Sequence, residues 1–262
     1  MIDIGINILN RQFYSDAEDV IERAFQVGVD KMILTGVNVA NSYKSAEFCD
    51  KCSKFLFSTA GIHPHEAKSM DEKSIAQLRE LSKSKAVKAI GECGLDYDRD
   101  FSPRPVQRKC FEAQIELAIE LKLPLFLHER AAFEDFNAIM NSYKEQIPKS
   151  VVHCFTGSLD EAKYYLEKGY FLGFTGAISD EKRFSHLKEV IEYTPLDRMM
   201  IETDAPFMLP KNMTNRSLRN NERRNEPAFL PYVASWIAQI KNISIERVQD
   251  ETTLVANRFF NL

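Results

Sequence analysis

The stretch Val87-Lys88-Ala89-Ile90-Gly91-Glu92 decides the fold, because it is a short apolar run that stops at an acid. The run lacks strict alternation of apolar and polar residues, which is typical of a parallel strand buried on both faces. Seven further runs of this kind indicate seven more strands. They span residues 1–9, 31–36, 55–61, 124–129, 151–155, 170–175 and 199–204.

Segments with apolar residues at helical spacing separate the runs. Two of these segments open on a capping-box pattern, at residues 15–18 and 158–161. Further helices are predicted after Pro105 and near residues 39–53, 71–83, 132–144, 182–193, 227–241 and 244–258. Eight strand-then-helix units predict an α/β fold, a (β/α)8 TIM barrel, with an extra C-terminal helix.

No linker or change of composition divides the chain, so one domain is expected over residues 1–262. The alternative is an open, doubly wound sheet. That fold is disfavoured because no glycine-rich phosphate loop follows the first predicted strand.

The composition excludes several classes of protein. With 44% hydrophobic and 27% charged residues, the chain is neither disordered nor fibrous. No apolar run approaches the length of a membrane span, so no membrane partner is expected. The net charge of −4 excludes a protein held on DNA mainly by its overall charge. Five scattered cysteines favour reduced thiols and a cytoplasmic location over a disulfide framework.

Four of the five histidines fall where predicted strands end, and acids end two further strands. In a (β/α)8 barrel the active site lies at these carboxyl ends of the strands. Imidazoles and carboxylates that converge there predict a metal site. The residues at these ends are His63, His65, Glu92, His128, His153, Glu202 and Asp204.

Glu92 and Asp204 each follow an apolar run, and an unpaired buried charge is costly. Lys88 and Arg198 are the nearest candidates for an ion pair, but they lie at the opposite ends of the same strands. A bound cation is therefore the better compensation. His65, next to Pro64, is expected to point to solvent.

Together these motifs resemble the TatD-type metal-dependent deoxyribonucleases, of the TatD-proper branch of the amidohydrolase-like barrel superfamily. The resemblance runs from about residue 1 to residue 260. It rests on the stretches 3–7, 61–65, 89–96, 128–130, 152–157, 201–206 and 223–227.

The resemblance implies a divalent-metal-dependent nuclease that trims DNA from the 3′ end with a metal-activated water. Single-stranded DNA ends are the expected substrate, and RNA is a further possible substrate. DNA repair is one process that such an activity would serve. The implied metal ligands are Glu92, His128, His153 and Asp204. Glu92, Asp204 and His63 are the implied catalytic residues. Asp204 completes the metal shell or takes the proton from the water, and His63 lies along the scissile phosphate.

One departure from the wider family concerns the first strand. Most members carry a His-x-His pair there, whereas this chain has Gly5 and Asn7. Asn7 offers only a neutral oxygen to a second, weaker metal. Glu202 is expected beneath the site, either as a partner of the ligands or as a structural hydrogen-bond acceptor. One or two ions are therefore expected, with Mg²⁺ favoured, Mn²⁺ as a substitute and Zn²⁺ not excluded.

The segment 211–224 carries five basic residues and one acid, or +4 locally, in a chain of net charge −4. It could grip phosphates, which would make binding salt-dependent, or it could be a solvated loop. Arg216, Arg223 and Arg224 are the candidate contacts. Tyr97 and Phe101 could stack on bases or pack on the barrel rim.

Two rival functions stay open at this point. One is hydrolysis of another bond on the same barrel, such as an aminoacyl-tRNA ester, an amide or a lactone. The other is a non-catalytic relative that binds nucleic acid. A monomer is expected in either case.

Overall fold

The computed structural model describes residues 1–262 except 52–53, 144 and 214–223. Strands alternate with helices along the chain, and the strand order follows the sequence, which confirms the (β/α)8 fold class. The strands are β1 (Ile2–Ile6), β2 (Lys31–Leu34), β3 (Leu56–Ala60), β4 (Val87–Asp96), β5 (Leu125–Arg130), β6 (Ser150–Val152), β7 (Phe171–Phe174) and β8 (Met199–Ile201).

The helices also follow the predicted order. They are α1 (Ala17–Gln26), α2 (Val39–Asp50), α3 (Ser74–Leu81), α4 (Arg104–Leu121), α5 (Phe133–Ser142), α6 (Leu159–Glu167), α7 (Glu181–Phe184), α8 (Leu187–Tyr193), α10 (Leu230–Lys241) and α11 (Ile245–Phe260). The single helix expected near 182–193 is in fact two short ones, α7 and α8. Within the described part of the chain, no helix combines the length and the apolar character needed to cross a membrane.

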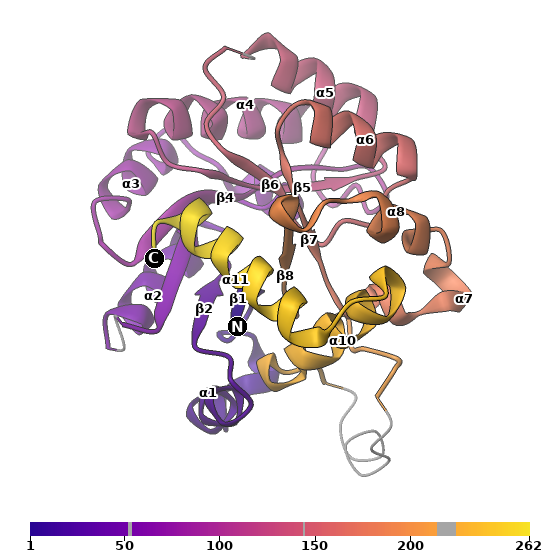
Figure 1. Ribbon diagram of the computed structural model, residues 1–262. Helices are drawn as coiled ribbons and strands as arrows, with labels where there is room; N and C mark the ends of the chain where they lie inside the picture. The colour runs from indigo at the N-terminus through magenta and orange to yellow at the C-terminus, as the bar shows by residue number, and fades with distance from the viewer. Residues whose placement is uncertain (52–53, 144, 214–223) are drawn as a thin grey trace. The chain divides into compact units, whose positions relative to one another are not determined.

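The chain forms two compact units, and the first to consider is Leu34–His153. Strands β3, β4, β5 and β6 pair in parallel within it. Helix α2 packs against β3 and α4 packs against β4 (Figure 1). Because the strands run in one direction, their carboxyl ends meet at one edge of the sheet. This edge carries every residue of the metal centre described below.

Glycine allows β4 to lie close to β5 near this edge. Gly94 has φ 144°, a conformation that residues with a Cβ rarely adopt. A Cβ at this position would overlap the carbonyl oxygen of His128, which is the register partner of Gly94. The glycine therefore sets the spacing between the two strands that carry Glu92 and His128.

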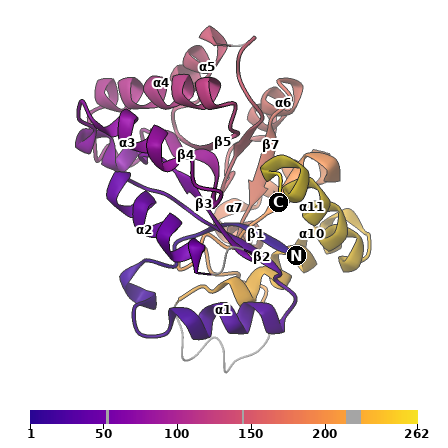
Figure 2. The same ribbon diagram turned by 90° about the vertical axis from the view of Figure 1, so that its left-hand side faces the viewer.

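The second unit comprises Met1–Ile33 and Cys154–Leu262. Strand β7 pairs with β8 in parallel, and Ile6 at the end of β1 bridges to Ala205. Helices α10 and α11 lie side by side (Figure 2). Helix α11 also packs against β1 and β8, so the predicted extra C-terminal helix covers the strands of this unit.

One of the two predicted capping boxes is correct. Ser158 accepts a hydrogen bond from the backbone of Glu161, whose side chain bonds back to Ser158, at the start of α6. The box predicted at 15–18 is wrong, because α1 begins after Asp16 and no side chain caps it. The Asp16 carboxylate is instead engaged by two arginines, Arg23 and Arg224.

Asp3 is a fully buried acid on β1. Its Oδ1 accepts hydrogen bonds from the backbone of Gly5 and Thr203, and its Oδ2 lies 2.5 Å from the hydroxyl of Thr203. Burial raises the pKa of Asp3 to about 8, despite these hydrogen bonds. The folded protein therefore carries a neutral Asp3 at pH 7, whereas the unfolded chain carries it ionised.

We expect Asp3→Asn to remove a pH dependence of stability. A raised folded pKa contributes stability that is full below about pH 4 and is lost as the pH rises towards 8. Asparagine keeps the Oδ1 acceptor and has no such proton. From pH 5 to pH 7 the wild type should therefore lose about 3 kcal/mol of unfolding free energy relative to the variant. Urea unfolding at the two pH values measures this, with the exposed Asp19→Asn as control. An equal pH dependence in wild type and Asp3→Asn would contradict an acid that is neutral when folded.

Candidate metal centre

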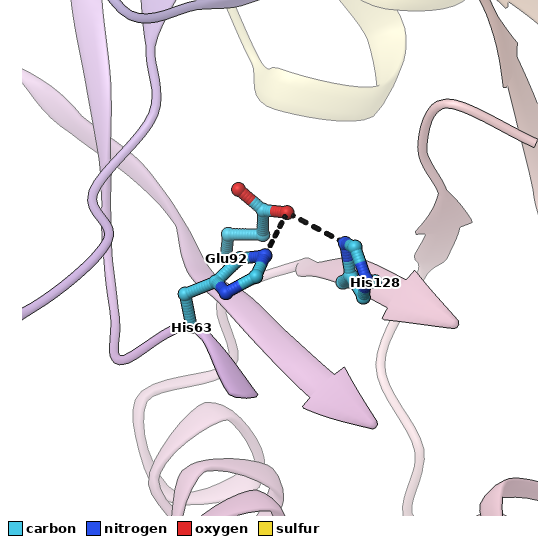
Figure 3. A group of neighbouring side chains, drawn as sticks. All are labelled: His63, Glu92 and His128. Atoms are coloured by element: carbon cyan, nitrogen blue, oxygen red, sulfur yellow. Dashed lines mark hydrogen bonds and ion pairs between the residues drawn. The ribbon is translucent and has the colours of Figure 1, made fainter. Parts of the chain in front are cut away.

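Three histidine rings converge on one carboxylate oxygen in the unit Leu34–His153. Oε1 of Glu92 lies 3.1 Å from Nε2 of His63, 2.9 Å from Nδ1 of His128 and 2.7 Å from Nε2 of His153. Figure 3 shows the rings of His63 and His128 directed at this oxygen. The sequence predicted all four of these residues, and the structure brings them together.

The ends of the parallel strands place these side chains. Glu92 lies on β4 and His128 on β5, while His153 follows β6 and His63 follows β3. The backbone of Glu92 donates to Gly36 at 2.8 Å, and the backbone of His153 donates to Leu127 at 2.9 Å. The sheet therefore fixes the backbone of Glu92, His128 and His153, whereas His63 is placed by the short helix that it caps.

The hydrogen bonds of His63 identify it as a donor. Its Nδ1 accepts a hydrogen bond of 3.0 Å from the backbone of His65, where His63 caps the short helix Pro64–Ser69. Burial, and secondarily the neighbouring His128, lowers the pKa of His63 to about 4, so the ring is neutral at pH 7. A neutral ring whose Nδ1 accepts must carry its proton on Nε2. His63 therefore directs an N–H group, and not a lone pair, at Glu92.

His128 is held differently, because both of its ring nitrogens face carboxylates. Nδ1 faces Glu92, and Nε2 lies 3.1 Å from Oδ2 of Asp96. Burial lowers the pKa of His128, but the hydrogen bonds to Asp96 and Glu92 outweigh it and raise the pKa overall. Asp96 can only accept when ionised, so Nε2 carries a proton and Nδ1 is the atom that His128 can offer to a metal.

Glu92, on which the rings converge, is ionised. Burial by itself raises the pKa of Glu92, but the electrostatic interactions with His63 and His153 and the hydrogen bonds from His128 and His153 hold it well below the usual value. Ligand atoms of His63, Glu92 and His128 lie within 4.8 Å of one another. One anionic oxygen among imidazole nitrogens suits a divalent cation such as Mn²⁺ or Zn²⁺, and the carboxylate suits Mg²⁺. A divalent ion therefore fits this set of donors.

Asp96 is a residue of this centre that the sequence analysis missed, and His65 is one whose direction it predicted wrongly. Nε2 of His65 lies 2.7 Å from Oδ2 of Asp96, so the expectation that His65 points to solvent is wrong. In the sequence analysis Asp96 is only the last residue of the stretch 89–96. For Asp96 the available signal was parity, because it is four residues after Glu92 on one strand. No such signal exists for His65, which lies in the short helix Pro64–Ser69.

Asp204, Asn7 and Glu202 belong to the other unit. The side chain of Asn7 donates a hydrogen bond of 3.0 Å to Oδ1 of Asp204, and the backbone of Asp204 donates to Gly5. Glu202 is fully buried and accepts a hydrogen bond of 2.5 Å from the backbone of Cys154, the residue after His153. Glu202 thus accepts a hydrogen bond within its own unit, and its place beneath the metal site stays a prediction.

The aromatic candidates for base stacking differ in exposure. Phe101 is 57% exposed, and its ring lies 4.7 Å from that of His65. The hydroxyl of Tyr97 donates to Asp135 at 2.6 Å, and Arg104 lies over the Tyr97 ring. Phe101 is therefore open to a ligand beside the centre, whereas Tyr97 is engaged by protein groups.

The basic candidates fall into two groups. Arg216 and Arg223 lie outside the described residues. The guanidinium of Arg224 pairs with Asp16 at 2.7 Å and Glu226 at 2.6 Å, and it lies over the ring of Phe13. Arg224 is thus held by neighbouring acids of its own unit.

The chain is similar to known proteins over nearly its whole length. A family model described as TatD related DNase matches residues 2–261. A protein of Erwinia tasmaniensis named 3′-5′ ssDNA/RNA exonuclease TatD is 41% identical over 262 residues, which are 100% of this chain and 100% of the relative. A protein of the same name from a Rahnella strain is also 41% identical, over 100% of this chain and 98% of the relative.

Solved structures share the fold. The TatD homologue YJJV of Escherichia coli has a TM-score of 0.90 at 24% identity, over 100% of this chain and 98% of that one. A TatD family hydrolase of Entamoeba histolytica has a TM-score of 0.88 at 26% identity, over 99% and 97% of the two chains. These likenesses confirm the fold class.

Proposed function

The chain belongs to the TatD related DNase family, and we propose that it is a divalent-metal-dependent 3′-5′ exonuclease that hydrolyses phosphodiester bonds at single-stranded ends. The observation that carries this proposal is the convergence of three histidine rings on Glu92. The names of the full-length relatives, ssDNA/RNA exonucleases, support both the polarity and the single-stranded substrate.

We assign the metal to Glu92, His128 and His153, with Asp204 as the fourth ligand predicted from the end of its strand. A bound Mg²⁺ or Mn²⁺ would lower the pKa of a coordinated water and polarise a phosphoryl oxygen. As the alternative to ligation, Asp204 would accept the proton of the attacking water at its carboxylate, whose Oδ1 accepts a hydrogen bond from Asn7. A second ion near Asn7 stays part of the proposal, as the weaker of the two.

His63 has the role of a hydrogen-bond donor. Its Nε2 carries a proton that Glu92 accepts at 3.1 Å. A phosphate oxygen that approaches Glu92 would find the same N–H group in place, with no need to change the tautomer. His63 therefore orients the scissile phosphate and is not itself a metal ligand, although its distances alone would allow ligation.

Substrate binding would use an exposed aromatic ring and basic groups. Phe101 lies beside His65, so a base at the end of a strand could stack on it while the phosphate reaches Glu92. Unstacked bases are available in single strands and frayed ends, which favours these over duplex interiors. Arg216 and Arg223 stay candidate phosphate contacts.

The location and process are also proposals. Two buried cysteines, Cys93 and Cys110, are free thiols, which suits the reducing cytoplasm. Trimming of single-stranded 3′ ends is an activity that DNA repair requires. The monomeric state stays a prediction.

Incubation with DNA labelled at its 5′ end tests the function. With Mg²⁺ we expect a ladder of products shortened from the 3′ end, complete loss of activity in excess chelator, and recovery when Mn²⁺ is added back. Blunt duplex and RNA of the same sequence, run in parallel, measure the strand and sugar preference. Absence of metal-dependent shortening would contradict the exonuclease. Binding without cleavage would favour the non-catalytic alternative, and release of an aminoacyl ester instead would favour the other hydrolase.

A further inference from the structure

Asp96 is a buried acid that the proposed reaction does not use directly. It ends β4 and is 1% exposed. Its Oδ2 lies 2.7 Å from Nε2 of His65 and 3.1 Å from Nε2 of His128. Its Oδ1 accepts hydrogen bonds from the backbone of Asp98 at 3.1 Å and of Arg99 at 2.9 Å. Each oxygen of the carboxylate therefore has two donors, so the group cannot rotate without losing several hydrogen bonds at once.

The backbone of Asp96 is fixed as well. The side chain of Gln107, fully buried on α4, accepts from the Asp96 backbone at 2.8 Å and donates to its carbonyl oxygen at 3.1 Å. Gln107 also donates to the carbonyl of Ser102, whose hydroxyl donates to the carbonyl of His65. The strand end, the carboxylate and the outer histidine are thus connected by one network.

We propose that Asp96 is a positioning residue, which fixes the ring of His128 with its proton on Nε2 and so presents Nδ1 to Glu92 and the metal. The inference rests on the proposed function. A carboxylate that faces Nε2 can only accept, so Nε2 keeps its proton and Nδ1 is the nitrogen that gives up its proton when it binds a metal. A carboxylate behind a metal-binding histidine also makes that ring a better ligand. His65 donates to the same oxygen and holds it towards His128.

Asp96→Asn reverses this arrangement with little change of shape. The amide oxygen would keep the two backbone donors of Asp98 and Arg99, because the NH₂ group cannot face them. That leaves the NH₂ group towards Nε2 of His128, which must then accept, and the ring proton moves to Nδ1. Nδ1 would then meet the metal with a proton in place of a lone pair.

We expect Asp96→Asn to bind Mn²⁺ about 10- to 100-fold more weakly than wild type. Titration of Mn²⁺ followed by electron paramagnetic resonance of the free ion measures this without any turnover. The matched control is Asp98→Asn, which removes the same charge two residues away, where the side chain forms surface ion pairs with Arg99 and Arg130. The control should bind Mn²⁺ as wild type does.

A second measurement needs no variant. In wild type saturated with Mg²⁺, two-bond ¹H–¹⁵N correlation spectra of the histidines should show His128 protonated at Nε2 and not at Nδ1. The opposite tautomer would overturn the proposal. A loss of Mn²⁺ affinity below fivefold in Asp96→Asn, or an equal loss in Asp98→Asn, would also overturn the proposal. Either result would leave the proposed function intact as long as the wild type binds Mn²⁺. If wild type bound no Mn²⁺, both the metal site and the role of Asp96 would fall.

Discussion

Glu92→Gln should lower kcat/KM for single-stranded DNA by on the order of 10³-fold, or about 4 kcal/mol of transition-state stabilisation. The carboxylate oxygen of Glu92 is the shared partner of His63, His128 and His153. Glutamine has nearly the same shape but carries no charge, and only one of its terminal atoms accepts hydrogen bonds. The three rings would lose their common anion, and a divalent cation would lose its central ligand.

The measurement is initial rate against DNA concentration at saturating Mg²⁺, together with Mn²⁺ affinity. Both should fall in Glu92→Gln, and raising the metal concentration should restore only part of the rate. The control is Glu120→Gln, which removes an equal charge from α4 at a surface ion pair with Arg79. If Glu92→Gln kept more than a tenth of the wild-type kcat/KM, the centre assigned here would be in the wrong place.

The places of Glu92 and His128 could be predicted from the sequence because each interrupts a largely apolar run. A parallel strand buried on both faces is mostly apolar, so an acid or an imidazole within the run stands out. The predicted strand ends were too early, since β4 continues to Asp96 and β5 to Arg130, but the regular strand order still brings Glu92 and His128 to one edge. Fold and site therefore shared one signal, and both could be predicted from it.

The partners of the ligands could not be predicted in the same way. The direction of the His65 ring depends on the short helix Pro64–Ser69 and on the hydrogen bond between Ser102 and His65. Neither contact leaves a periodic pattern. The capping box at 15–18 also failed, and one of the two arginines that engage Asp16 lies 208 residues further along the chain. Local patterns do not report contacts at such separations.

Arg224 was predicted to bind phosphate, but its contacts within the protein lead us to expect that its replacement lowers stability. Its guanidinium donates to the carbonyl of Gln12, to both oxygens of Asp16 and to the buried Glu226, and its side chain is 15% exposed. Arg224→Ala would leave Glu226 with Arg23 as its remaining described partner. Removal of one member of a largely buried ion network leaves charge uncompensated, so we expect a loss of about 3 kcal/mol in the free energy of unfolding. For a chain of this size that corresponds to a fall in Tm of roughly 6–12 °C.

Calorimetry and the salt dependence of DNA binding together separate the two roles of Arg224. If it ties the chain at 224–226 to the segment at 12–16, the variant melts early while the slope of log K against log salt stays as in wild type. If it contacts phosphate, the slope falls by about one and Tm hardly changes. Arg11→Ala, which removes an exposed charge from the neighbouring segment, controls for charge alone.

Asp16→Asn should reproduce part of the fall in Tm, and more strongly at pH 7 than at acid pH. Hydrogen bonds from Arg224 lower the pKa of Asp16, and a lowered folded pKa gives stability that is present above the unfolded pKa and lost as the pH falls through the folded one.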